Sequence, residues 1–190
     1  MSEDADWPVA VRGVTESVVT TLGPNDRWNV AALGLHAGDP VTATTWGRTR
    51  TWRNFRERGG GYVQFTRDSV DFVDAALGTR EEADPVLDSA DAWVEVTVER
   101  LESGEDGGTQ WVEWALHPVE AAIERETVPT TNRGYYAVVE ATVAASRLDV
   151  DAYDREALVE RLAYFAEVVE RCGGERERAA FDRIRDRTEW

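Results

Sequence analysis

Six arginines lie between positions 48 and 67 of this chain, and a single acid, Glu57, lies among them. The segment therefore carries a formal charge of +5 within a protein whose formal charge is −16. Arginine presents a planar fork of N–H donors that matches the oxygens of phosphate and carboxylate groups. A positive segment in such an acidic protein is a candidate site for an anion.

The first part of this segment, Gly47–Thr51, has the residue types of a phosphate cradle. It follows a predicted strand and opens a short predicted helix, where free backbone N–H groups and the helix dipole favour an anion. Two threonine hydroxyls and two arginines complete the set. Its glycines match neither the P-loop nor the dinucleotide fingerprint. The alternative is an arginine-rich helix face in solvent, with Trp52 and Phe55 on the buried side.

Few other residues are candidates for metal binding or nucleophilic catalysis. Cys172 is the only cysteine, which excludes an internal disulfide and a cysteine-rich metal site. His36 and His117 are far apart in the sequence and have no cysteine partners, so we expect no metal site. Serines and the cysteine stand in no recognisable nucleophile motif, which leaves catalytic residues unassigned.

The composition is that of a folded globular chain. A length of 190 residues with 42% apolar residues and eight tryptophans is enough for a packed core. No apolar run reaches the ~18 residues of a membrane span, and the first residues are acidic, so we expect no membrane anchor and no signal peptide. The expected compartment is the cytoplasm.

The charge balance indicates adaptation to salt. The chain has 37 Asp and Glu against 21 basic residues, all of them arginine. Like charges repel one another, and concentrated salt screens this repulsion. We interpret the protein as halophilic. Because the Debye length falls to ~3 Å at ~1 M salt, ligand binding must then depend on short, direct contacts.

Short β-type runs separated by turn signals fill the first two-thirds of the chain. Gly23–Asp26 predicts a hairpin turn, Glu102–Gly108 predicts a second turn, and Gly78–Ala92 predicts a surface loop. Six strands of this kind favour a small barrel or a sandwich. They are Glu16–Thr21, Trp28–Leu35, Val41–Thr45, Gly61–Thr66, Ala92–Leu101 and Gln110–Pro118.

After about Val119 the apolar period changes from two residues to about 3.6, which is typical of helices. Amphipathic helices are predicted at Gly134–Arg147, Asp154–Arg171 and Glu175–Arg187. Two short helices, Thr51–Arg58 and Asp68–Leu77, are predicted between the strands. The fold class is therefore α+β, with a barrel over residues 1–120 and a helical extension packed on it over residues 121–190.

The order of these features resembles an uncharacterised, mainly archaeal family related to the flavin reductases. The resemblance covers about Val14–Leu77 and Thr131–Leu148. It rests most on the Gly-x-Thr-x-Thr-x-x-Asn pattern that begins at Gly47 and on Asn-Arg-Gly at 132–134. In that family a split β-barrel binds flavin mononucleotide (FMN) and a helical extension follows. The chain differs from ordinary flavin reductases in lacking a recognisable histidine motif near the end of the barrel.

The resemblance implies roles for nine residues and a homodimer with FMN near the subunit interface. The phosphate would be held by Arg48, Thr49, Arg50 and Thr51. Asn54 would steady this cradle, and Asn29 and Gln64 would meet the edge of the isoalloxazine ring. Asn132 and Arg133 would close the site from the helical part.

Three functions stay open from the residues. The first is an FMN-dependent oxidoreductase in which the cofactor carries the electrons. The second is a flavin carrier or sensor without turnover. The third is nucleic-acid binding, with Trp46, Trp52 and Tyr62 as stacking platforms. Because salt weakens phosphate-backbone binding and the −16 charge repels a polyanion, we expect no nucleic-acid partner. The electron donor and the substrate are unassigned.

Overall fold

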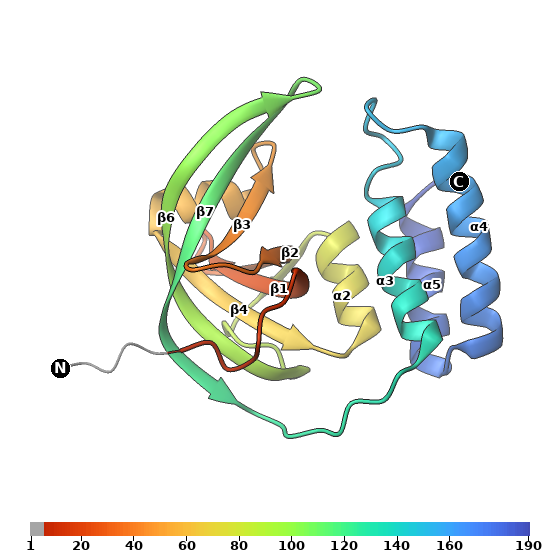
Figure 1. The fold of residues 1–190 in the computed structure, drawn as a ribbon, viewed down its shortest axis with the longest axis horizontal. Helices are drawn as coiled ribbons and strands as arrows, with labels where there is room; N and C mark the ends of the chain where they lie inside the picture. Colours follow the sequence, from red (N-terminus) through yellow and green to blue (C-terminus); the bar gives the residue numbers. More distant parts are fainter. Residues whose placement is uncertain (1–5) are drawn as a thin grey trace. The chain divides into compact units, whose positions relative to one another are not determined.

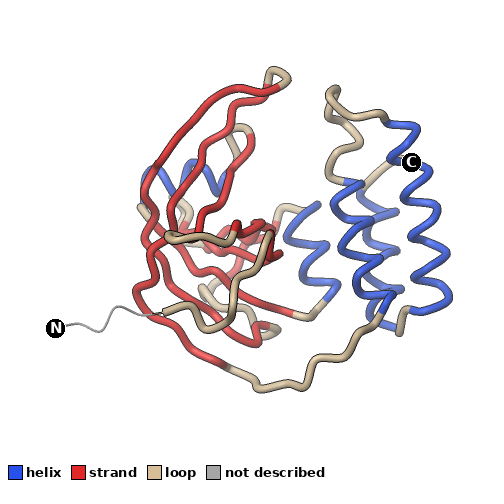
Figure 2. Tube along the Cα trace, viewed as in Figure 1, coloured by secondary structure: helices blue, strands red, loops and turns tan. Residues whose placement is uncertain are grey.

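The computed structural model describes residues 6–190, and the acidic start of the chain, residues 1–5, lies outside it. The described chain forms two compact units, each built from two segments (Figure 2). The first unit joins the chain up to Arg67 to Arg80–Thr127, and the second joins Asp68–Thr79 to Val128–Trp190. Among the helices of residues 6–190, none is both long and apolar enough to cross a membrane.

Six antiparallel strands form the closed barrel that the sequence predicts (Figure 1). Around the barrel the order is β1-β4-β6-β7-β3-β2, and pairing of β1 with β2 closes it. The six strands are β1 (Val14–Leu22), β2 (Trp28–His36), β3 (Val41–Trp46), β4 (Gly60–Thr66), β6 (Ala90–Asp106) and β7 (Thr109–Ile123). Valine, leucine and aromatic side chains from their inner faces fill the core, because side chains alternate between the two faces of a strand.

The predicted surface loop at Gly78–Ala92 is wrong in part. Residues Arg80–Glu82 form a seventh strand, β5, which pairs with Trp28–Val30 of β2. The segment after β5 then closes over the barrel, where Pro85 O accepts hydrogen bonds from the buried side chains of Thr20 and Gln64. An exposed strand edge and two buried donors therefore order a segment whose composition indicates a loop.

The predicted turn at Glu102–Gly108 is also shorter than expected. Strand β6 continues to Asp106 and β7 begins at Thr109, and the two remain paired to the end. The reversal is confined to Gly107 and Gly108, whose φ angles of 54° and 79° suit glycine. Exposed acidic residues occupy the ends of these strands because the ladder requires only backbone groups. The result is a long two-stranded ribbon.

Helix α1 (Arg50–Arg58) docks on the barrel core by one face, on which Thr51, Asn54 and Phe55 are buried. The Asn54 Nδ2 donates to Thr21 Oγ1 at 3.0 Å and to Thr21 O at 3.4 Å. The Phe55 ring meets the Trp114 ring edge to face, with centroids 5.6 Å apart. A polar anchor to β1 and an aromatic anchor to β7 thus fix the helix.

The second unit contains four helices: α2 (Ser69–Leu77), α3 (Arg133–Ala145), α4 (Arg155–Cys172) and α5 (Glu175–Arg187). The three C-terminal helices confirm the prediction, and α2 joins their apolar core through Val70 and Val73. Ion pairs hold α2 to α5. The Asp74 carboxylate lies 3.0 Å from Arg183 and 2.8 Å from Arg187, and Asp68 lies 2.7 Å from Arg176.

Replacing Asn54 by alanine is expected to lower the free energy of unfolding by about 1–3 kcal/mol, because buried groups of Thr21 lose their partner. The matched control is Arg58→Ala on the exposed end of the same helix, for which we expect a change within about 0.5 kcal/mol. Denaturant unfolding followed by tryptophan fluorescence measures both. Equal losses in the two variants would contradict the anchoring role of Asn54.

Replacing Asp74 by asparagine is expected to destabilise the helical unit by about 1–2 kcal/mol, since two guanidinium groups lose a largely buried carboxylate. Asp182→Asn is the control, because Asp182 pairs with Arg185 at an exposed position of α5 and such pairs contribute little. Chemical unfolding at low salt, followed by circular dichroism, measures the free energy of unfolding of both variants. A loss in Asp182→Asn as large as in Asp74→Asn would refute this assignment.

Candidate functional site

The predicted phosphate cradle lies at the junction between β3 and α1, as the spacing of its residues indicates. Strand β3 ends at Trp46, and Gly47 then turns the chain with a φ of +69°. Its N–H donates to Gln110 O at 2.7 Å, which ties the junction to β7. A residue with a side chain is strained at this φ, so glycine permits the turn.

The N terminus of α1 offers free donors at this junction. Thr49 caps the helix, and its Oγ1 accepts the Trp52 N–H at 3.2 Å. The first N–H groups of a helix have no partner within it, so the amides of Arg50 and Thr51 point out of the helix end. Together with the helix dipole these amides favour an anion.

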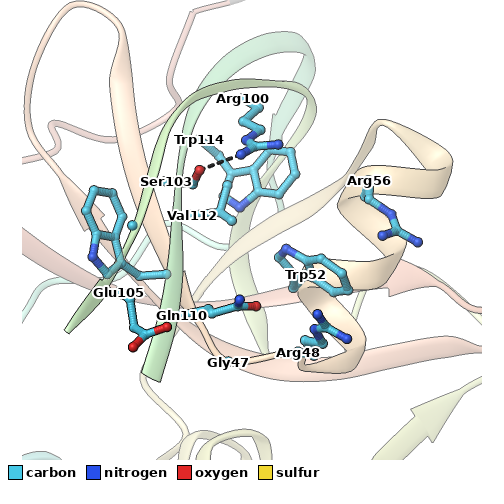
Figure 3. Close-up of a pocket in the computed structure, with 12 residues that line it drawn as sticks. Gly47, Arg48, Trp52, Arg56, Arg100, Ser103, Glu105, Gln110, Val112 and Trp114 are labelled. Atoms are coloured by element: carbon cyan, nitrogen blue, oxygen red, sulfur yellow. Dashed lines mark hydrogen bonds between the residues drawn. The ribbon is translucent and has the colours of Figure 1, made fainter. Parts of the chain in front are cut away.

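A cavity of about 480 Å³ lies between α1 and the β6–β7 ribbon (Figure 3). Its walls combine aromatic rings with three guanidinium groups, and among the described residues that line it Glu105 is the one carboxylate. The lining residues are Gly47, Arg48, Trp52, Arg56, Arg100, Ser103, Gly104, Glu105, Gln110, Trp111, Val112 and Trp114. This volume is in the range of pockets that hold small molecules and cofactors.

One end of the cavity lies at the helix N terminus. Gly47 is bonded there to Gln110, and Gln110 pairs with Glu105 across the ribbon. Arg48 lies at this end and also borders a smaller hollow of about 390 Å³ beside the tip of the ribbon. Among residues 6–190 Arg48 forms no ion pair, so its charge is available to a ligand.

Strand register places the other end of the cavity farther along β7. Arg100 pairs with Trp114, and the Trp114 ring contacts Phe55 of α1. At about 3.3 Å per residue, Trp114 lies about 13 Å along the strand from Gln110. The Trp114 Nε1 donates to Thr45 Oγ1 at 2.9 Å, which fixes the ring as part of this wall.

The arginines of the predicted anion site do not all converge. Arg48 and Arg56 line the cavity, with the Arg56 guanidinium stacked 4.7 Å from the centroid of the Trp52 ring. Arg50 instead lies 2.9 Å from Glu81 of β5, and Asn25 donates to the same carboxylate at 3.0 Å. This ion pair ties the first turn of α1 to β5 and to the β1–β2 turn.

The two residues predicted to contact the edge of the flavin ring, Asn29 and Gln64, are both buried in the barrel. Asn29 pairs with Thr21 across β1–β2, so it is buried beside the residue that Asn54 binds. Gln64 is fully buried and its amide donates to Thr20 Oγ1 and Pro85 O. Its Oε1 accepts the Leu87 N–H at 2.7 Å. These contacts stabilise the barrel, and the flavin contacts expected of Asn29 and Gln64 stay predictions.

Asn132 and Arg133 belong to the helical unit. Asn132 caps α3 by accepting the N–H groups of Gly134 and Tyr135, and Arg133 is the exposed first residue of that helix. Their expected part in closing the site stays a prediction.

Sequence reasoning missed several residues of the cavity. Arg56 was within the positive segment but unassigned, whereas Arg100 and Gln110 gave no local signal. Trp111 and Trp114 gave a signal as strand tryptophans, which are more often core than ligand-binding residues. Only the register between β6 and β7 brings Arg100 to the same cavity as α1. Among residues 6–190 no cluster of His, Cys, Asp and Glu could hold a metal ion.

Comparison with known proteins shows the same fold elsewhere. An FMN-bound protein from Methanosarcina mazei matches 93% of this chain and 95% of its own, at 23% identity and a TM-score of 0.77. Weaker likenesses include the flavin reductase of styrene monooxygenase from Pseudomonas putida S12, with 15% identity, coverage of 58% and 79%, and a TM-score of 0.42. An FMN-binding protein from Thermus thermophilus has 17% identity, coverage of 65% and 82%, and a TM-score of 0.39.

Family models match both parts of the chain. The N-terminal domain of a family described as "Protein of unknown function (DUF447)" matches residues 15–125. A second model with the same description matches residues 132–186. The structure and its likeness to the Methanosarcina mazei protein confirm the split barrel and the helical extension that the resemblance implies. From the matches of the two family models, the chain belongs to the DUF447 family.

Proposed function

We propose that this protein binds FMN and that the junction between β3 and α1 holds the phosphate of the cofactor. The observation that carries the proposal is the position of Arg48, which has no ion-pair partner among residues 6–190. It lines an aromatic cavity beside the open N terminus of α1. The FMN-bound protein from Methanosarcina mazei, which shares the fold, supports FMN among the possible phosphate ligands.

The residues of the cavity fit the parts of this cofactor. At the Gly47 end, the guanidinium of Arg48 suits a phosphate dianion. Residues 49–51 are not among those that line the cavity, and the helix N terminus that they form adds its dipole. Trp52, in the first turn of α1, and Val112 and Trp114, farther along β7, provide apolar walls for a flat ring system. The separation of these two regions along β7 leaves room for a linker between phosphate and ring.

Each residue of the cradle would have a distinct task. Arg48 would bind the phosphate through two parallel N–H···O bonds. Thr49 fixes the first turn as its cap and keeps a hydroxyl hydrogen to donate. Arg50 is oriented by Glu81 and keeps further N–H donors. Thr51 supplies a backbone amide at the helix end, and Asn54 holds the helix against β1.

We further propose that the protein is an oxidoreductase. Bound FMN would supply the electron transfer, and the chain would bind the cofactor, orient it and exclude water from it. Among the described residues that line the cavity, none is a histidine, cysteine or tyrosine. This lining suits a protein whose side chains position the reacting group and do not themselves react.

We also propose that the protein is a homodimer in a salty cytoplasm, with FMN near the subunit interface. The half-exposed Trp46 supports contact with a second copy. A nucleic-acid partner is disfavoured at Tyr62, one of the three expected stacking residues, because carboxylates lie near it. Burial raises the pKa of Tyr62, and the nearby Glu95 and Glu120 raise it further.

Replacing Arg48 by glutamine is expected to weaken FMN binding by about 1.5–3 kcal/mol, roughly tenfold to a hundredfold in Kd, because a charge-assisted hydrogen bond is lost. Titration of the protein with FMN, followed by quenching of flavin fluorescence, measures the change. Arg58→Gln is the control, since Arg58 is exposed on the same helix and outside the cavity. An unchanged Kd in Arg48→Gln would place the phosphate elsewhere.

Mixing the FMN-loaded protein with NADH or NADPH under anaerobic conditions separates an oxidoreductase from a carrier or sensor. A nicotinamide-dependent oxidoreductase predicts loss of the flavin absorption near about 450 nm as the cofactor is reduced. Absorption is recorded over time against free FMN at equal concentration. A spectrum that changes no faster than that of free FMN would exclude turnover with these donors and favour flavin storage or sensing.

A further inference from the structure

A second positive group lies at the end of the cavity away from Gly47. It consists of Arg56 on α1 and Arg100 on β6, both of which line the cavity (Figure 3). The Arg56 guanidinium lies over the Trp52 ring. Arg100 donates to Ser103 Oγ and pairs with Trp114 across the ribbon. Neither residue belongs to the phosphate cradle proposed above.

Arg56 and Arg100 belong to parts of α1 and β6 that lie farther along the cavity than the phosphate cradle. The backbone of Arg56 lies six residues after Arg50, about 9 Å along a helix that rises about 1.5 Å per residue, and its guanidinium lies 4.7 Å from the centroid of the Trp52 ring. On the opposite wall Trp114 lies about 13 Å along β7 from Gln110. A ligand with its phosphate at Arg48 and its ring between Trp52 and Trp114 would therefore bring the far edge of the ring to Arg56 and Arg100.

The charge of this group is not balanced within the cavity. Glu105, the carboxylate among the described lining residues, pairs with Gln110 and so belongs to the Gly47 end. Arg56 has an ion pair with Glu57 at 3.3 Å, but both side chains are about half exposed, and such pairs contribute little. Two guanidinium groups thus face the apolar part of the cavity.

We propose that Arg56 and Arg100 stabilise the reduced, negatively charged ring of bound FMN relative to the oxidised, neutral ring. The inference rests on the proposed binding of FMN. An oxidised ring that takes two electrons and one proton carries one negative charge, and a two-electron donor of the dithionite or dihydronicotinamide class is oxidised in return. A guanidinium attracts that charge, and the attraction is stronger where the bound ring excludes water from the pair.

Stabilisation of the reduced ring and simple contact with the ligand have different effects on the reduction potential of bound FMN. A residue that only packs against the flavin would bind both redox forms alike and leave the reduction potential unchanged. A residue that stabilises the anion binds the reduced form more tightly and raises the potential. Arg48, at the phosphate end, is expected to bind both forms alike.

The test compares the parent protein with Arg100→Gln and Arg56→Gln, using Arg58→Gln as a matched control on α1. The Kd of oxidised FMN is measured by fluorescence, and the midpoint potential of bound FMN by anaerobic titration with dithionite and a reference dye. We expect each cavity variant to lose about tenfold in affinity for reduced relative to oxidised FMN, which lowers the midpoint potential by about 30 mV. Arg58→Gln is expected to match the parent in both measurements.

The outcomes distinguish this inference from the proposed function. Cavity variants that bind FMN with the parent's midpoint potential would overturn the inference and leave FMN binding intact. Equal weakening of both redox forms would also overturn it, since that result assigns the arginines to contact alone. A parent protein that binds neither form of FMN would refute the proposed function, and the inference with it.

Discussion

The docking of α1 on the barrel is the constraint on which the site depends. Asn54 binds Thr21 of β1, and Phe55 contacts Trp114 of β7, so the helix is anchored at two strands. These anchors fix the N terminus of α1 beside Gln110 and align the helix with the ribbon. The cavity lies between the helix, the part of β6 beyond its pairing with β4, and the part of β7 that pairs with β3.

In the salty cytoplasm that we propose for this protein, electrostatics would depend on local contacts. The chain carries a formal charge of −16, yet Arg48, Arg56 and Arg100 converge on one cavity. At ~1 M salt the Debye length is ~3 Å, so surrounding carboxylates neither attract nor repel a ligand at long range. Bidentate contacts, free helix amides and exclusion of water persist under those conditions. Arginine is suited to such a site because its charge does not depend on pH in the physiological range.

Much of the fold could be predicted because its signals are local. The alternation of Val94, Val96 and their polar neighbours predicts β6, and Asp154 before an amphipathic run predicts α4. The place of Gly47–Thr51 between a strand and a helix could be predicted for the same reason, and its binding of a phosphate stays a prediction. Strand β5 has three polar residues and no pattern of its own, and only the edge of β2 orders it. The places of Gln64 and Arg100 depend on tertiary contacts and strand register, which residue types do not encode locally.

The central claim is that the β3–α1 junction binds a phosphate. It is tested most directly by comparing the dissociation constant of FMN with that of riboflavin, which lacks only the phosphate. Isothermal titration calorimetry of the parent protein in concentrated salt gives both dissociation constants. The account predicts that FMN binds more tightly by about 1.5–3 kcal/mol, the range of a charge-assisted hydrogen bond. Equal affinity for the two flavins would contradict it.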